Sequence, residues 1–124
     1  MEHTKGYYSL IQYCPDRSRM ELCNLGVILF APQINFLDIK IIKNNNKVKK
    51  FFGKNSFDDK WLTNAKNSLV YTIKNIKSKE EFEHFIQTRA NELILSNLTS
   101  VRIIYPEITL ANLFLELIQG NILW

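Results

Sequence analysis

The sequence has few of the residues from which metal, redox and nucleophilic sites are built. It contains only two cysteines, Cys14 and Cys23, and two histidines, His3 and His84. Neither cysteine belongs to a CxxC motif, and a metal site needs several such ligands at spacings that close around one ion. We therefore predict no metal and no cofactor. We expect two reduced, partly buried thiols, with a disulfide between neighbouring strands as the less favoured alternative.

Glycine-rich loops and long apolar runs are also missing. The four glycines are scattered and form neither a dinucleotide-binding nor a P-loop pattern. No apolar run reaches the length of about 18 residues that a membrane-spanning helix requires. The first five residues lack the apolar stretch of a signal peptide. These observations predict a cytoplasmic protein with no membrane contact and no catalytic site.

What is present is typical of one folded domain. The 124 residues are 46% hydrophobic and 23% charged, a balance that supports a core and argues against disorder. No repeat, low-complexity tract or linker divides the chain. We therefore predict a single domain over residues 1–124.

Strand-forming and helix-forming segments are separated along the chain. Aromatic, β-branched and apolar runs predict strands over residues 6–13, 24–31, 34–42 and 101–105. The run over 24–31 is apolar throughout, so we place it centrally, covered on both faces. Apolar residues at steps of three and four predict helices over about 57–77, 78–97 and 106–119.

The order of these segments predicts an α+β fold. We expect an antiparallel N-terminal sheet, built from a three-strand meander and one or two short strands, with three helices packed on one face. Ser56 and Ser78 are expected to cap the first two helices, and Pro106 should begin the third. Gly120 should end that last helix. Residues 47–52 fit either a short edge strand or a helical turn.

A block of lysines occupies the middle of the chain. Residues 40–54 contain six lysines and no acid, which creates a positive potential that attracts nucleic acid or an acidic protein surface. Lysines also protect exposed sheet edges from aggregation, and we give this structural explanation equal weight. The lysines predicted to bind a nucleic acid or an acidic partner are Lys43, Lys47, Lys49, Lys50 and Lys54.

A second unusual segment precedes the most apolar strand. Arg19, Glu21 and Asn24 surround the entry to this strand, and Gly26 lies inside it. Glycine weakens a strand unless a backbone approaches closely or the strand bulges there. We favour a hydrogen-bonded corner that fixes the first hairpin over a recognition surface. A hydrolase or nuclease site, in which a further acid joins these residues, is a third and weaker hypothesis.

This segment carries a resemblance to a known family. The strand YYSLIQYCP, followed by Arg19-x-Glu21-x-x-Asn24-x-Gly26-Val27 and an apolar run, resembles the bacterial domain-of-unknown-function family 3037. The later helices are compatible with that family over nearly the whole chain, although Leu25 stands where the family commonly has valine. The resemblance implies no established activity. The family's genes often lie beside HipA-like kinases, which implies a role in toxin–antitoxin or phage–host conflict.

Together these observations predict a non-catalytic protein that binds a macromolecule. The partner would be a protein or a ribonucleoprotein: either a kinase, or an immune effector such as a CRISPR nuclease that this chain inhibits. Trp124, at the end of the apolar Ile122–Trp124 segment, is a possible partner anchor, although a terminal tryptophan more often folds back onto the core. The alternative is an RNA- or DNA-binding protein that acts through the lysines of residues 40–54.

Overall fold

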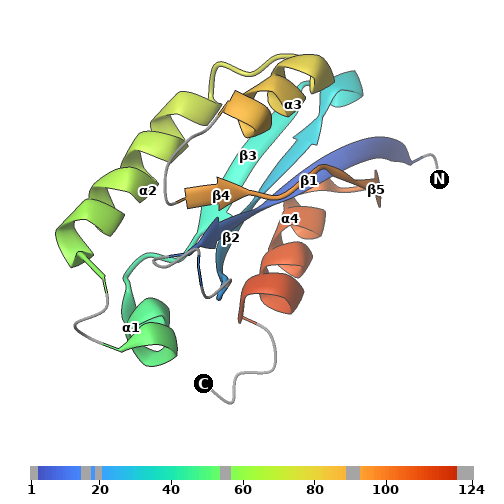
Figure 1. Ribbon diagram of the computed structural model, residues 1–124. Coiled ribbons are helices and arrows are strands. Elements are labelled where there is room, and N and C mark those ends of the chain that lie inside the picture. The colour runs from blue at the N-terminus through green and yellow to red at the C-terminus, as the bar shows by residue number, and fades with distance from the viewer. Residues whose placement is uncertain (1–2, 15–17, 19–20, 54–56, 89–92, 120–124) are drawn as a thin grey trace.

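A five-stranded antiparallel sheet forms the centre of the molecule (Figure 1). The computed structural model describes residues 3–14, 18, 21–53, 57–88 and 93–119. The strand order is β3-β2-β1-β4, and β5 also pairs with β1. The strands are β1 (Thr4–Tyr13), β2 (Cys23–Ala31), β3 (Phe36–Ile41), β4 (Leu93–Leu95) and β5 (Thr99–Ile103).

Strand β2 is central because its side chains are apolar on both faces. Ile28 and Phe30 belong to one hydrophobic cluster, whereas Val27 and Leu29 belong to another. Successive side chains of a strand point to opposite faces of the sheet, so these two clusters lie on opposite sides. The continuous apolar run in the sequence correctly predicts a strand that is covered on both faces.

Helices accordingly cover both faces of the sheet. Helix α2 (Asp59–Ile73) and helix α3 (Lys79–Thr88) bury Leu62, Leu69 and Phe82 in the cluster that contains Ile28. Helix α4 (Pro106–Phe114) and the π-helical turn η3 (Leu115–Gln119) form the other cluster with Val27. Figure 1 shows α4 on the side of the sheet opposite to α2 and α3.

The α+β class and the antiparallel meander are confirmed. The arrangement of the helices differs from the prediction in two details: the short helix α1 (Asn46–Phe52) is a fourth helix, and α4 lies on the second face. The physical reason is contained in β2 itself. A strand that is apolar on both sides exposes one apolar face to water unless each side has its own cover.

The edge of the sheet formed by β4 differs more clearly from the prediction. Residues 93–95 form β4, so the predicted helix over 78–97 is wrong in its last turn. Leu93 and Ile94 fit the helical spacing, but pairing with β1, in which Leu95 lies opposite Ile11, determines their conformation. Ser96, which follows β4, is bonded to β1, because its side-chain oxygen accepts from the Leu10 N–H at 2.8 Å.

The helix starts follow capping chemistry. Ser78 caps α3, with the Glu81 N–H donating to its hydroxyl at 3.1 Å, and Glu81 in return accepts from the Lys77 N–H. Pro106 begins α4 as expected. Asp58 caps α2 by accepting from the Trp61 N–H. Ser56, the predicted cap, and Gly120 lie outside the described residues.

Candidate functional site

The lysine block does not form one continuous surface. Residues 46–52 are helical, which excludes the edge-strand explanation for that part of the block. Lys47 points inward: its Nζ donates to the backbone oxygens of Asn24 and Ile118, both at 2.6 Å. Lys43 and Lys50 are exposed and Lys49 is half-buried, so these three remain as surface cations. Lys54 lies outside the described residues.

Burial explains the behaviour of the Lys47 amine and its neighbour. Desolvation lowers the pKa of Lys47, and the nearby Cys23 thiol opposes this shift. Desolvation raises the pKa of Cys23, and the positive charge of Lys47 works against that change. Both cysteines are buried free thiols, as the sequence predicts. Lys47 therefore joins α1, β2 and η3 and is not displayed to a partner.

The described residues of the segment that carries the family resemblance form a hydrogen-bonded corner at the β1–β2 hairpin. The side chain of Asn24 accepts from Gln12 Nε2 at 2.9 Å and donates to the Leu117 oxygen at 3.2 Å. Asn24 thus connects the β1–β2 hairpin to the C-terminal turn. Glu21, three positions before Asn24, is half-buried, and Arg19 lies outside the described residues.

Gly26 has the close backbone contact that its place in the strand predicts. A Cβ atom added there would lie 2.6 Å from the Lys40 oxygen and 2.9 Å from the Ile41 Cα. The β1–β2 register also shifts beside it, between Ile11 and Gln12. Both conditions under which a strand tolerates glycine, close approach and irregular pairing, are met.

A different group of side chains gathers at the opposite end of the sheet. Lys5 pairs with Arg102, and Tyr7 pairs with Ser100, across the β1–β5 ladder. Directly opposed residues in an antiparallel pair lie on the same face, and His3 is two positions from Lys5. The register therefore places five polar or aromatic side chains on one face: those of His3, Lys5, Tyr7, Ser100 and Arg102.

This face is the one that α3 covers only in part. Val101, Ile103 and Tyr8 belong to the α4 cluster, so the residues that alternate with them face the α3 side. There the sheet is hollowed into two adjoining cavities of about 530 and 490 Å³, which share Lys5 and Ser100. We call this hollow the basin; its lining is His3, Lys5, Tyr7, Gln33, Lys79, Glu83, Ile86, Gln87, Asn97, Leu98, Ser100, Val101 and Arg102.

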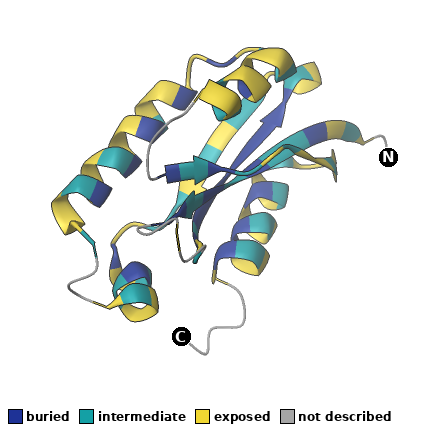
Figure 2. Ribbon diagram, in the orientation of Figure 1, coloured by how far each residue is buried: buried dark blue, intermediate teal, exposed yellow. Residues whose placement is uncertain are grey.

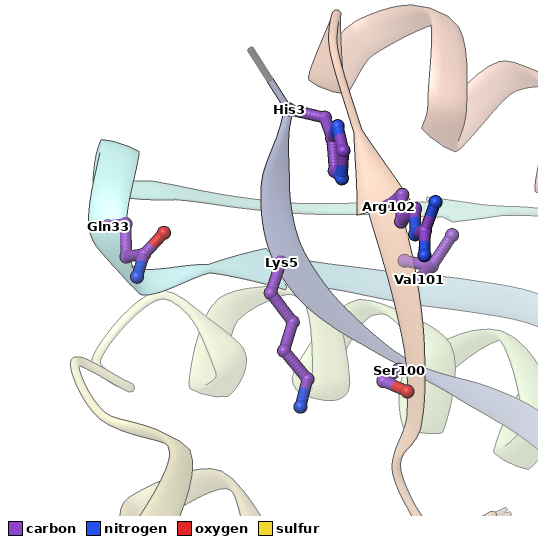
Figure 3. A pocket seen from close by; sticks show the side chains of 6 residues that line it. All are labelled: His3, Lys5, Gln33, Ser100, Val101 and Arg102. Atoms are coloured by element: carbon purple, nitrogen blue, oxygen red, sulfur yellow. The ribbon is translucent and has the colours of Figure 1, made fainter.

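Figure 3 shows the outer part of the basin, whose side chains come from β1, β5 and the turn after β2. Gln33 belongs to that turn, the 3-10 helix η2 (Pro32–Ile34). The inner part is also lined by the apolar side chains of Ile86 and Leu98. The basin thus combines polar and apolar lining residues.

The charge of the basin is mainly positive. Lys5, Lys79 and Arg102 line it, whereas Glu83 is the one acid among its described lining residues and lies 3.6 Å from Lys79. Among the described residues, neither Lys5 nor Arg102 forms an ion pair with an acid. Like charges directly opposite each other across two strands destabilise a sheet. An anion bound between Lys5 and Arg102 would remove that repulsion.

Tyr7 holds two of these cations in place. Its ring centre lies 5.7 Å from the Lys5 Nζ and 4.8 Å from the Lys79 Nζ. Both distances fall within the range of a cation–π interaction. Tyr7 therefore keeps two ammonium groups from different elements, β1 and α3, at the basin before any ligand arrives.

Sequence reasoning did not identify the basin because its residues are dispersed. Lys5, Tyr7, Lys79 and Arg102 come from three separate segments and form no local motif. The available signal was the pairing of an N-terminal strand with the strand near residue 101, since register alone brings Lys5 opposite Arg102. Trp124, the predicted partner anchor, lies outside the described residues.

The described part of the chain also limits other interpretations. It contains no helix long and apolar enough to cross a membrane. Within those same residues, no three His, Cys, Asp or Glu side chains are placed to hold a metal ion. The geometry provides cations and hydrogen-bonding groups around a hollow, which is suited to binding an anion.

Comparison with known proteins gives a family but no activity. No curated protein and no solved structure matches the chain. The model of the family described as protein of unknown function DUF3037 matches residues 8–118. This match includes Glu21, Asn24 and Gly26 of the corner and most of the sheet. The chain therefore belongs to the DUF3037 family.

Proposed function

We propose that this protein is a non-catalytic binding module whose basin takes the phosphate groups of a single-stranded nucleic acid, for which RNA is the test ligand. The observation that carries the proposal is the directly opposed pair Lys5–Arg102, two cations without an acidic partner among the described residues. Two directly opposed cations repel each other in the empty sheet, and both attract an anion that binds between them.

The chemistry of the lining favours phosphate. Arginine offers planar, bidentate donors that suit phosphate oxygens, and lysine supplies a compact charge. Ser100, Asn97 and Gln87 add neutral hydrogen-bonding side chains along the same hollow. Two adjoining cavities suit an extended chain of phosphates better than one small anion.

The exposed lysines near α1 are the alternative nucleic-acid site. Lys43 and Lys50 are exposed, but the inward Lys47 divides the block and donates to backbone oxygens instead of a ligand. The same block also has an acid as a neighbour in the fold, since Asn45, between Lys43 and Lys47, bonds Asp59 of α2. We therefore rank the basin above the block.

The test is the salt dependence of binding to a labelled single-stranded RNA. With three phosphate contacts, from Lys5, Lys79 and Arg102, the log–log slope should be about −2, since each contact on a single strand contributes about −0.7. Affinity should fall roughly 15-fold between about 50 and about 200 mM salt at that slope. The double variant K5A/R102A should retain a slope of about −0.7.

The matched control is K43A/K50A, which removes the same charge from the other end of the molecule. It should bind RNA with the wild-type slope. If K43A/K50A loses binding and K5A/R102A does not, the lysine block is the site and the basin is not. Failure of the wild-type protein to bind RNA at about 50 mM salt, where phosphate contacts are strongest, would reject the nucleic-acid proposal and leave an acidic protein surface as the partner.

The biological setting is proposed on the family resemblance alone. A kinase partner or an immune effector such as a CRISPR nuclease would place the protein in toxin–antitoxin or phage–host conflict. A ribonucleoprotein partner would combine both expectations, because the basin could then compete for guide RNA. We propose a cytoplasmic location, which suits the two buried, reduced thiols. Purification with the native partner and its RNA tests this setting.

A further inference from the structure

Helix α4 presents an apolar outer face, and we infer that this face docks a basic amphipathic helix of a protein partner. The inference does not depend on the basin, which lies on the other side of the sheet. It begins from composition: Pro106–Phe114 reads PEITLANLF and η3 continues LELIQ. The segment is rich in apolar residues, more than one buried stripe along a helix requires, so part of its apolar surface must be covered by something other than the sheet or face solvent.

Only one side of α4 is covered by the described chain. Leu110 and Phe114 are buried against the sheet, and the turn η3 adds the buried Ile118. On the outer side, Ile108 is 57% exposed and Leu115 is 53% exposed. Tyr105, at the start of the helix, is 54% exposed, and Ala111 and the polar Asn112 are both exposed between Ile108 and Leu115.

These exposed residues form one line along the helix. Ile108, Ala111 and Leu115 are separated by three and four positions, which places them on one face of an α-helix. We call Tyr105, Ile108, Ala111 and Leu115 the α4 outer face. Three large apolar side chains at this spacing are the pattern by which amphipathic helices anchor in one another.

Helices α2 and α3 do not share this feature. The outer side of α2 carries exposed Lys60, Asn64 and Asn67, and α3 exposes Glu80 and Glu83 (Figure 2). An exposed Tyr71 on α2 is a single residue among polar neighbours. Scattered apolar residues are normal on a surface, whereas a contiguous line marks an interaction site.

Charge identifies the partner. Two acids, Glu107 and Glu116, are exposed. Glu107 immediately precedes Ile108 in the sequence, and Glu116 immediately follows Leu115. Residues 106–119 contain no lysine or arginine. Two bases contact this segment, both at its buried residues: the Lys47 Nζ donates to the Ile118 oxygen at 2.6 Å, and the Lys40 Nζ lies 5.3 Å from the ring centre of Phe114.

An acid-flanked apolar face is complementary to an apolar face flanked by lysine or arginine. A second copy of this chain would bring two further glutamates to the contact without an opposing base, so self-association is disfavoured. An anionic membrane surface is disfavoured for the same reason. The partner segment that fits this face is therefore a basic amphipathic helix.

The probe is a labelled peptide of about 14 residues, built from leucine at helical spacing and lysine elsewhere. Its comparison peptide carries glutamate in place of every lysine. We expect the Leu/Lys peptide to bind the full chain and the Leu/Glu peptide to bind at least about tenfold more weakly. I108S/L115S should reduce the affinity for the Leu/Lys peptide at least about tenfold, because anchor residues carry most of the binding energy.

Two control variants separate the charge from the apolar contact. E107Q/E116Q should weaken binding of the Leu/Lys peptide by a few fold and reduce the difference in affinity between the Leu/Lys and Leu/Glu peptides. Y71S, which removes an exposed aromatic residue from α2, should change neither affinity. The thermal midpoint of I108S/L115S should remain within a few degrees of wild type, because both side chains are exposed.

Four results would overturn the inference. They are equal binding of the two peptides, unchanged binding by I108S/L115S, a concentration-dependent dimer that this variant abolishes, and a tenfold gain in peptide affinity when residues 121–124 are deleted. The third result would assign the α4 outer face to a second copy. The fourth would assign it to the end of this chain.

Discussion

The two ends of the sheet use positive charge in opposite ways. At the corner, Lys47 donates to two backbone oxygens and joins three elements. At the basin, Lys5 and Arg102 face each other across two strands, without an acidic partner among the described residues. The lysine-rich stretch of the sequence is therefore partly internal structure, whereas the dispersed cations form the surface with unmet charge. The place of each amine in the fold decides what it can bind, and the number of lysines in a stretch of sequence does not.

The largest effect should come from the corner, at Gly26. G26A would place a Cβ atom 2.6 Å from the Lys40 oxygen and 2.9 Å from the Ile41 Cα, both of which are backbone atoms. Backbone cannot rotate away as a side chain can, so we expect a loss of about 2–3 kcal/mol in the free energy of unfolding, at the upper end for overpacking. Urea denaturation measures this loss.

G6A is the matched control for Gly26. Its added Cβ would meet the end of the Ile103 side chain, which can move, and would lie 3.1 Å from the Phe30 backbone oxygen, farther than the backbone atoms are at Gly26. The loss should therefore be about 1 kcal/mol, at the lower end for overpacking. A larger loss in G6A than in G26A would show that the close backbone contact at the corner is not what requires glycine.

The next effect tests whether Lys47 is structural. K47M removes the donor to the Asn24 and Ile118 oxygens and leaves both carbonyl groups without that partner. We expect unfolding to become easier by about 1–3 kcal/mol, the usual penalty for unsatisfied buried polar groups. K43M, an exposed lysine of the same block, should change stability by less than about 0.5 kcal/mol. Equal effects in the two variants would mean that Lys47 is an ordinary surface cation.

A smaller effect, opposite in sign, is expected in the basin. R102T removes one of two directly opposed cations and should raise the free energy of unfolding by about 0.2–1 kcal/mol at low salt. The same change should weaken RNA binding, so stability and affinity move in opposite directions. R102K keeps the repulsion and should give no gain in stability. A loss of stability in R102T would show that Arg102 supports the fold.

The smallest effect concerns pH. Burial lowers the pKa of Lys66, although the charge of Asp59 opposes the shift. Between the folded pKa and 10.5, the unfolded chain binds more protons at this residue than the folded chain, so the contribution of Lys66 to stability increases as pH rises. The difference in unfolding free energy between wild type and K66M should therefore grow in favour of wild type toward pH 10.5. A difference that is constant or that shrinks would contradict this assignment.

The sequence predicted what depends on local pattern. The apolar run of β2 indicated its central position, Pro106 indicated the start of α4, and Ser78 with Glu81 indicated the start of α3. The place of Gly26 inside an apolar strand indicated either a close backbone approach or a bulge, and the Lys40 oxygen and Ile41 Cα do lie close to it. In each case the deciding interaction involves a few adjacent residues or the two faces of one strand.

What the sequence did not predict depends on distant pairing. Leu93 and Ile94 fit a helix by spacing, but β1 provides hydrogen bonds that a helix end could not match. Lys5 and Arg102 meet only because β5 returns to β1 with a register set by the whole sheet. Lys47 looked like its neighbours in sequence, although its amine turns inward to carbonyl groups from residues 24 and 118.

The central claim is that the basin, not the lysine block, is where an anionic strand binds. The most direct test is a titration of the isotope-labelled protein with a short oligouridine RNA, following the backbone amide signals by NMR. We predict that the largest shifts occur at Lys5, Tyr7, Ser100 and Arg102, which line the basin from β1 and β5. Shifts confined to residues 43–52, with the basin signals unchanged, would contradict the account.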